Sequence, residues 1–421
     1  MNTRDREGEA RRIDPERLAL WFAWPAILGE FGPSSPTGYQ YDPVLEPPQP
    51  DRPLDDYPAE LDRELVSIAA EHERIAVLMS GGLDSAAILH RLVRLVGGER
   101  VVAVTADLTD DRGASSASVA AKLTAAIDPA VEIVVAEPDP ATPARWSPVA
   151  PRLDAAPHHN DALLLAAARS GSTVVLTGNG GDEIFGAPRF LSGHLAAAKQ
   201  WRKLLSYAAD TSLYSLEATW KEPLSAVSDR LPRRLMTAVY HRVAWQELNR
   251  PTPAVLAERW RPVVETWSRE WHHRIARIEA ALGSWAHLDA WWNVFPLAPL
   301  AVGVDDIEVR HPFLAPRVLR AALARPVSDR YDHTWPYAYW RAKAGGVSLF
   351  DSSLLASLPT VKQTFRTTLL AGHRLDGEPT ALLDAGILRA PGRANDELFD
   401  LRASVVESWL REALRRGYTV A

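Results

Sequence analysis

The sequence predicts an α/β fold, with a parallel sheet flanked by helices and a large helical insertion and C-terminal part. Three observations lead to this prediction. Short apolar runs alternate with helical stretches between residues 59 and 177, and glycine-rich segments follow two of these runs. Tryptophan-rich helical patterns then fill residues 190–300. Strands that are apolar throughout, without in–out alternation, are typical of parallel sheets covered on both faces.

The regular part of the chain begins with an amphipathic helix. Leu61, Leu65, Ile68 and Ala69 have the i, i+4, i+7, i+8 spacing of one helix face. The apolar runs that follow are predicted strands, at residues 75–79, 101–106, 131–136 and 173–177. Predicted helices separate them, at residues 86–96, 114–127 and 161–170. Ligands of such sheets bind outside the carboxyl ends of the strands.

The two ends of the chain differ from this alternating part. Residues 1–58 are predicted to form a short N-terminal appendage, because an aromatic patch at 18–28 precedes eight prolines between Pro33 and Pro58. A proline-rich segment is extended. An amphipathic helix is predicted at 395–415.

The helical region is rich in tryptophan, and packing between helices explains most of these side chains. A lining for an aromatic or peptide substrate is the alternative interpretation. The tryptophans are Trp201, Trp220, Trp245, Trp260, Trp267, Trp271, Trp285, Trp291 and Trp292.

Composition limits the class of protein. A chain of 421 residues can bury a large core. A net charge of −6 differs from the basic excess of nucleic-acid-binding proteins. No apolar run approaches the ~20 residues needed to span a bilayer, and the first 17 residues lack a signal-peptide pattern. Cysteine is absent, which excludes disulfides and thiolate sites. We therefore expect a cytoplasmic protein with neither nucleic-acid nor membrane partners.

Residues 80–85, Ser-Gly-Gly-Leu-Asp-Ser, connect the first predicted strand to a helix. This layout aims backbone N–H groups and a helix N-terminus at an anion. Gly81 and Gly82 allow close backbone approach, and Ser80 and Ser85 add hydroxyl donors. The carboxylate of Asp84 would repel a phosphate, so it indicates Mg²⁺ bound between protein and phosphates. The segment predicts binding of ATP and Mg²⁺, although a tight connection without a ligand is an alternative.

A second glycine-rich loop, residues 177–183, follows the fourth predicted strand. Gly178, Gly180 and Gly181 again permit close approach of the backbone to a ligand. Asp182 is a second carboxylate suited to the same Mg²⁺. Acidic residues from neighbouring strand ends hold such an ion between phosphates, where it neutralises charge on a leaving pyrophosphate.

Together, segments 80–85 and 178–183 resemble the PP-loop and the glycine-rich acidic loop of the asparagine-synthetase-like amide synthetases. This family includes β-lactam synthetases, carbapenam synthetase and lasso-peptide cyclases. The resemblance covers residues 59–365 and implies an adenine-nucleotide α-hydrolase-like fold for a synthetase domain at 59–421. It also implies a two-step reaction. A carboxylate attacks the α-phosphorus of ATP, giving an acyl-adenylate and pyrophosphate, and an amine then displaces AMP.

Two further segments imply residues that act on the substrates. Residues 303–314 resemble the segment that supplies an active-site glutamate, here Glu308, which would take a proton from the amine or orient a group that does. Residues 358–363 resemble the segment that supplies a lysine, here Lys362, suited to the α-phosphate or to the oxyanion of acyl transfer. Position alone also permits an ion pair between Glu308 and Arg310, and a surface lysine at 362.

Departures from the family narrow the choice of amine. Glutamine-dependent members carry an N-terminal glutaminase domain with a cysteine nucleophile, which this sequence lacks. We therefore expect no ammonia production from glutamine. The position filled by glutamate in asparagine synthetases and by tyrosine in β-lactam synthetases is Asn179, which is neutral and cannot be a general base.

The amine is then free ammonia, a second molecule or part of the acyl substrate. We expect the last, as in the lasso-peptide cyclases, which close an Asp or Glu side chain of a peptide on its N-terminal amine. The expected partners are a ribosomal precursor peptide and leader-binding or protease proteins. The alternatives are a small-molecule or ammonia-dependent amide ligase, a PP-loop tRNA-modifying enzyme and an inactive nucleotide-binding scaffold.

Overall fold

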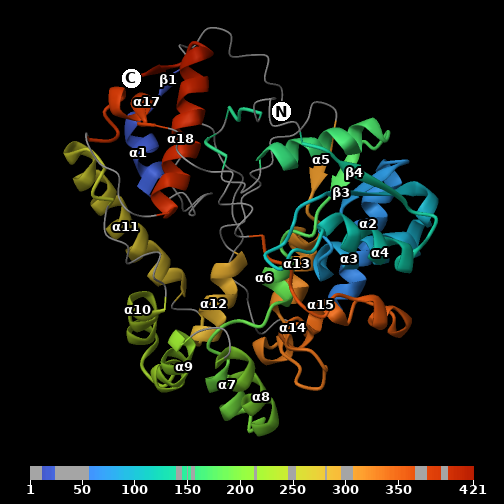
Figure 1. Cartoon of the computed structure of the whole chain (residues 1–421). Coiled ribbons are helices and arrows are strands. Elements are labelled where there is room, and N and C mark those ends of the chain that lie inside the picture. Colours follow the sequence, from blue (N-terminus) through green and yellow to red (C-terminus); the bar gives the residue numbers. More distant parts are fainter. Residues whose placement is uncertain are drawn as a thin grey trace.

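A five-stranded parallel sheet forms the centre of the part of the chain in which strands and helices alternate, as the computed structural model in Figure 1 shows. The structure describes residues 12–23, 56–138, 145–148, 150–152, 157–212, 216–244, 253–279, 282–294, 307–365, 377–389 and 397–421. The strand order is β4-β3-β2-β5-β6. The strands are β2 (Ile75–Leu78), β3 (Val101–Ala106), β4 (Glu132–Ala136), β5 (Val174–Leu176) and β6 (Glu308–Arg310). The predicted parallel sheet is confirmed, and β6 joins the four predicted strands.

Successive strand residues point to opposite faces of the sheet. Because neighbouring residues of the central strands are apolar, both faces are apolar. Ile75 and Val77 pack into one core cluster, whereas Ala76 between them packs into another. Helix α5 (Pro157–Arg169) contributes Leu164 and Ala167 to the second cluster. The first cluster includes residues of α2 (Tyr57–Glu71), α3 (Leu83–Val96), α4 (Ser116–Ile127) and α13 (Pro316–Leu323).

The helices agree with the expected amphipathic pattern. Leu61, Leu65 and Ile68 of α2 have no exposed surface. The helix begins at Tyr57, so Pro58 lies in its first turn, where the missing N–H of proline is tolerated. At the start of α4, Ser115 accepts a hydrogen bond from the backbone N–H of Ser118 and caps the helix.

The strand order brings the two glycine-rich loops together. From β2 the chain adds β3 and β4 on one side, and then returns to place β5 on the other side of β2. β2 and β5 therefore flank the point where the strand order reverses, with Ile75 paired to Val174. Ligands of open α/β sheets bind at such a switch point, outside the carboxyl ends of the strands. Both loops leave those ends.

The helical region predicted at residues 190–300 is mostly helical where it is described, with turns between its helices. Its helices occupy the lower left of Figure 1. Trp271, Trp285 and Trp291 are at most 2% exposed, whereas Trp201 and Trp220 are 58% and 52% exposed. Packing is thus the role of the first three, while Trp245 lies outside the described residues. The helices are α7 (Ser192–Ala197), α8 (Trp201–Ser212), α9 (Leu216–Ser228), α10 (Arg233–Val243), α11 (Arg261–Glu279) and α12 (Trp285–Val294).

The first and last described elements of the chain pack together beside this region. Helix α18 (Glu397–Arg415) confirms the predicted C-terminal helix and lies next to α1 (Pro15–Ala23) in Figure 1. Strands β1 (Arg12–Ile13) and β7 (Thr419–Val420) pair in parallel. Residues 12–23 of the predicted appendage therefore pack in a core, and its prolines from Pro33 to Pro53 lie outside the described residues.

The remaining elements are short. None of the helices in the described ranges combines the length and the apolar character that a membrane span requires. The remaining helices are α6 (Gly181–Phe185), α14 (Ala338–Ala342), α15 (Ala344–Val347) and α17 (Thr380–Asp384).

Candidate active site

The loop after β2 is shaped by its own serines. The hydroxyls of Ser80 and Ser85 lie 3.2 Å apart, and the N–H of Gly82 donates to the Ser80 hydroxyl at 3.3 Å. Gly81 has a φ of +78°, a conformation that favours glycine. A Cβ at this position would also lie 2.8 Å from the side-chain oxygen of Gln363. The sequence Ser-Gly-Gly is therefore required by the close packing of this turn.

The loop after β5 packs directly against the first loop through its glycines. A Cβ at Gly178 would lie 2.7 Å from the backbone nitrogen of Ser85, and one at Gly181 would overlap the carboxylate of Asp84. Gly180 has a φ of +91°. The two glycine-rich segments, 93 or more positions apart in the chain (178 − 85 = 93), thus form one surface at the carboxyl edge of the sheet.

Two carboxylates and two ammonium groups meet on this surface. Lys343 contacts the carboxylates of both Asp84 and Asp182. The Nζ atom of Lys362 donates to Oδ2 of Asp182 at 2.8 Å. The side chain of Lys362 is 55% exposed, whereas Lys343 as a whole is 4% exposed. The structure therefore brings together three of the residues predicted from sequence and adds Lys343.

The cluster sets the charge state of its members. Burial alone would lower the pKa of Lys343, but the carboxylates of Asp84 and Asp182 outweigh it and raise that pKa above its usual value. Burial acts to raise the pKa of Asp182, yet the adjacent ammonium groups of Lys343 and Lys362 hold it below its usual value. Burial, aided by repulsion from Asp182, raises the pKa of Asp84 against the attraction of Lys343. The Lys343 ammonium is therefore retained as the counter-charge of the two aspartates.

Some polar groups of the site lack partners among the described residues. Atom Oδ1 of Asp84 is buried without a hydrogen bond. The amide nitrogen and oxygen of Gln363, which packs over Gly81, are likewise buried and unpaired. Buried polar groups are normally satisfied, so such atoms point to a missing ligand. A carboxylate oxygen and an amide beside a turn of backbone N–H groups fit a nucleotide phosphate with its divalent ion.

The segment that carries Lys362 is fixed at both ends. The indole N–H of Trp340 donates to the carbonyl of Pro359 at 2.7 Å. The backbone N–H of Asp111 donates to the carbonyl of Thr364 at 2.8 Å. Lys362 is therefore positioned by α14 on one side and by the loop after β3 on the other.

The structure does not bring Glu308 to this cluster. Glu308 begins β6 and pairs in register with Val174, the first residue of β5. Its carboxylate is bound by Arg310, which also binds Glu71 at the end of α2. These residues occupy the amino edge of the sheet, opposite the glycine loops. Glu308 is an ion-pair partner of Arg310, and we correct its expected catalytic role on this geometry.

Sequence reasoning missed two groups at the carboxyl edge. His311 follows β6, and its Nδ1 atom lies 2.6 Å from the hydroxyl of Thr177. That hydroxyl also accepts a hydrogen bond from the backbone N–H of Asn179 at 3.2 Å. Burial lowers the pKa of His311, which keeps the ring neutral. Lys343 is the second missed group, and no local motif marks it.

With this geometry established, comparison with known proteins identifies the family. The family model named Asparagine synthase matches residues 66–344, which is more than half of the chain. The chain belongs to the asparagine synthase family. Members of this family are ATP-dependent amide ligases that form AMP, and they typically use Mg²⁺. No curated protein matches the chain.

The match covers most of the candidate active-site residues of this asparagine synthase family member. It includes both glycine-rich loops, the two aspartates and Lys343, and it ends before Lys362. The residues at the carboxyl edge therefore fit the ATP chemistry of the family. Asp84 and Asp182 are the carboxylates able to hold a divalent ion there, and residues 80–82 are the backbone able to hold phosphates.

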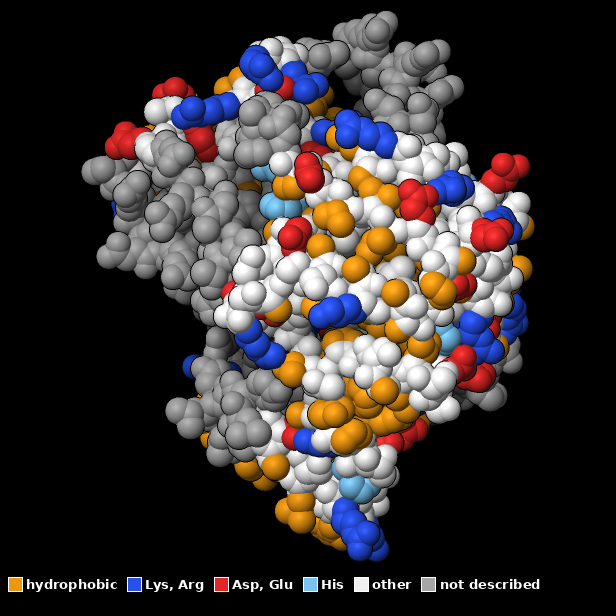
Figure 2. Space-filling model, turned by 45° about the vertical axis from the view of Figure 1, so that its right-hand side comes forward, with side chains coloured by type: hydrophobic (Ala, Val, Ile, Leu, Met, Phe, Trp, Pro, Cys, Tyr) orange, Lys and Arg blue, Asp and Glu red, His pale blue; other side chains and the backbone are white. Residues whose placement is uncertain are grey.

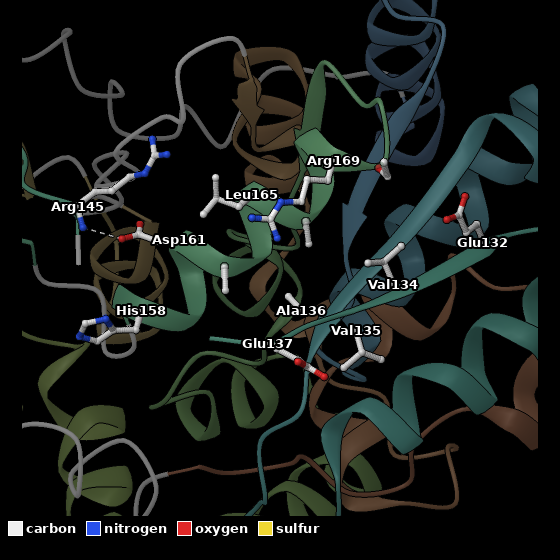
Figure 3. Close-up of a pocket in the computed structure, with 13 residues that line it drawn as sticks. Glu132, Val134, Val135, Ala136, Glu137, Arg145, His158, Asp161, Leu165 and Arg169 are labelled. Carbon is white, nitrogen blue, oxygen red and sulfur yellow. Dashed lines mark hydrogen bonds between the residues drawn. The ribbon is translucent and has the colours of Figure 1, made fainter. Parts of the chain in front are cut away.

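A pocket of about 660 Å³ lies elsewhere on the molecule, between β4 and α5 (Figure 3). Val134 and Ala136 of the edge strand and Leu165 of α5 line it, with the Arg145 backbone bonded to Asp161 at 2.7 Å. Figure 2 shows the molecule turned so that the right-hand side of Figure 1 comes forward. Basic, acidic and hydrophobic side chains are interspersed over this face. The pocket has none of the residues of the ATP motifs.

Proposed function

We propose that this asparagine synthase family member is a macrolactam synthetase of the lasso-peptide cyclase type. It adenylates a carboxylate side chain of a peptide and closes it on the N-terminal amine of the same peptide. One observation supports the choice of amine: a chain with both glycine-rich loops and the two aspartates has no cysteine. None of its 421 residues can therefore act as the cysteine that releases ammonia from glutamine.

In the first step, an oxygen of the substrate carboxylate attacks the α-phosphorus of ATP and the bond to the β-phosphate breaks. The backbone N–H groups of Gly81 and Gly82 and the hydroxyl of Ser80 hold the phosphates. Asp84 and Asp182 would hold Mg²⁺, which would neutralise charge on the leaving pyrophosphate.

In the second step, the amine attacks the acyl carbon and the bond to AMP breaks. The exposed ammonium of Lys362 stabilises the oxyanion that forms at the acyl carbon. The amine must lose a proton. His311 is a neutral imidazole beside the acidic loop, tied through Nδ1 to Thr177. It is therefore our choice of proton acceptor in place of Glu308.

Exposed apolar side chains on the helical region support a peptide as the substrate or partner. Trp201 and Leu205, one turn apart on α8, are 58% and 71% exposed. Trp220 on α9 is 52% exposed. Exposed aromatic and leucine side chains in such groups are typical of surfaces that bind other chains.

The test is incubation of the protein with ATP, Mg²⁺ and the precursor peptide encoded beside its gene, together with any neighbouring protease or leader-binding protein. We expect the peptide to lose one water by mass and pyrophosphate to be released. Asp182→Asn serves as the inactive control. An unchanged peptide mass with the correct peptide and partners would rule out the ring-closing reaction.

The family match by itself also supports a simpler amide ligase, acting on a small acid with ammonia or another amine. Pyrophosphate release that depends on aspartate or another small acid, rather than on a peptide, would favour this second function. An inactive scaffold would release no pyrophosphate with any of the tested acids. Salt-sensitive binding to tRNA would instead indicate a modifying enzyme.

A further inference from the structure

We infer, building on the proposed function, that Lys343 is a built-in counter-cation of the metal site. Its ammonium holds Asp84 and Asp182 together in the nucleotide-free protein, so that a divalent ion binds there only together with the nucleotide. Lys343 thereby makes metal binding conditional on phosphate.

The geometry places Lys343 where a shared ion would bind. Its Nζ atom contacts Oδ2 of Asp84 and Oδ1 of Asp182 at the same time. An ion that used these same two oxygens would compete with the ammonium for them. Because Lys343 is 4% exposed, its charge is poorly screened by water, and its displacement requires another acceptor.

The ion pairs of the cluster are matched without metal. Two carboxylates contact two ammonium groups, those of Lys343 and Lys362, and the carboxyl of Glu183 lies near enough to interact with Lys343 and both aspartates. A divalent ion alone would add two positive charges next to the buried ammonium of Lys343, which is unfavourable. Nucleotide phosphates reverse this balance, because they bring negative charge and oxygen acceptors. The Lys343 ammonium then transfers its hydrogen bonds to phosphate oxygens and frees the carboxylates for the ion.

The position of Lys343 in the chain suits this exchange. It is the single residue between α14 and α15, and its backbone is not helical, with φ −125° and ψ 35°. Four side-chain torsions allow the ammonium to turn without movement of the helices. Lys362 provides the contrast, since among the described residues its ion pair is with Asp182 alone, and its side chain is 55% exposed.

The experiment measures Mn²⁺ binding by electron paramagnetic resonance in the absence of nucleotide. We expect weak binding to the wild type and binding about tenfold tighter or more to Lys343→Met, which leaves two carboxylates without their buried counter-charge. Lys362→Met is the matched control, and its exposed charge predicts a change below about threefold. In Asp84→Asn combined with Lys343→Met, the gain should disappear. Equal Mn²⁺ affinity of the wild type and Lys343→Met would overturn the inference.

A measurement on the wild type alone keeps the inference testable if Lys343→Met does not fold. Mn²⁺ affinity is compared with and without an ATP analogue that has a methylene group between the α- and β-phosphorus. We expect the analogue to tighten Mn²⁺ binding by about tenfold or more. Tight Mn²⁺ binding to Asp84 and Asp182 without the analogue, lost in Asp84→Asn, would overturn the inference.

These titrations need no acyl or amine substrate, so failure to make an amide bond leaves them intact. If the analogue does not change Mn²⁺ binding to the wild type while Lys343→Met gains Mn²⁺ affinity, the result contradicts both the proposed ATP reaction and the dependence of metal binding on phosphate, and it supports only the role of Lys343 as counter-cation.

Discussion

The hydrogen bonds around Glu222 in the helical region contrast with the unpaired polar atoms at the carboxyl edge of the sheet. In the helical region, the carboxylate of Glu222 accepts hydrogen bonds from the backbone of Phe190 and the hydroxyl of Tyr207, at 2.7 and 2.8 Å. At the sheet edge, Oδ1 of Asp84 and the amide of Gln363 are buried without described partners. The first arrangement is complete within the protein and stabilises the fold. The second leaves a carboxylate oxygen and an amide for a ligand beside the two glycine-rich loops, which the family match covers.

Removing a carboxylate from the sheet edge should give the largest effect on activity. In Asp84→Asn, an amide replaces the charge that holds the metal, so we expect pyrophosphate exchange to fall by about 10⁴-fold or more. Exchange of labelled pyrophosphate into ATP measures this step. Glu308→Gln is the matched control and should change exchange less than about twofold. A loss of comparable size in Glu308→Gln would return that glutamate to the mechanism.

A substitution in the helical region should affect stability rather than chemistry. Trp285 is fully buried, packs edge-on against Phe190 with ring centroids 5.1 Å apart, and donates to the Ser228 hydroxyl. We expect Trp285→Ala to lower the free energy of unfolding by about 3–4 kcal/mol. Trp201→Ala, at a 58% exposed position, should lower it by less than about 0.5 kcal/mol. Urea denaturation measures both, and similar losses would contradict the assigned packing.

The sheet was predictable because its signals are local. Apolar runs such as that of β2, followed by Gly81 and Gly82, fix a strand and the turn after it within a dozen residues. The burial of Trp271 and Trp285 also followed from composition and helical spacing. For these elements, neighbouring residues supply most of the interactions that decide the structure.

Lys343 was not predicted, and for Glu308 the sequence left a catalytic role and an ion pair open, because distant contacts decide both positions. Lys343 reaches Asp84 across 259 positions of the chain, and no spacing rule connects the two. Glu308 lies only two residues from the end of β6, but those two residues carry it to the amino edge, where Arg310 donates to it and also to Glu71. A sequence motif predicts which residue type is present. The register of the three-residue strand β6 decides whether that residue lies at the amino or the carboxyl edge of the sheet.

Substitution of Lys362 should have an effect of intermediate size on the chemistry at the sheet edge. Because its side chain is 55% exposed and, in the part of the chain that the structure describes, forms an ion pair with Asp182 alone, its removal should leave the loops intact. We expect Lys362→Ala to slow amide formation by about 10²-fold, while affinity for ATP changes less than about threefold. Single-turnover rates and a nucleotide titration separate the two quantities. A wild-type rate in this variant would remove Lys362 from the mechanism.

The smallest expected effect is that of replacing Gln363, and it distinguishes a side chain that binds a ligand from one that stabilises the fold. Both amide atoms of Gln363 are buried without described partners, so the side chain destabilises the nucleotide-free protein. Gln363→Met keeps the length and removes the unpaired atoms. We expect it to raise the free energy of unfolding by about 1 kcal/mol and to weaken nucleotide binding several-fold.

Thermal unfolding with and without the methylene analogue of ATP measures both changes in one series. Gln200→Met, which alters a glutamine away from the sheet edge, is the control and should leave the shift caused by the analogue unchanged. A structural role for Gln363 predicts the opposite sign, with lower stability and unchanged nucleotide affinity. The sign of the stability change therefore decides whether the unpaired amide belongs to the ligand or to the fold, which is the distinction between the two regions.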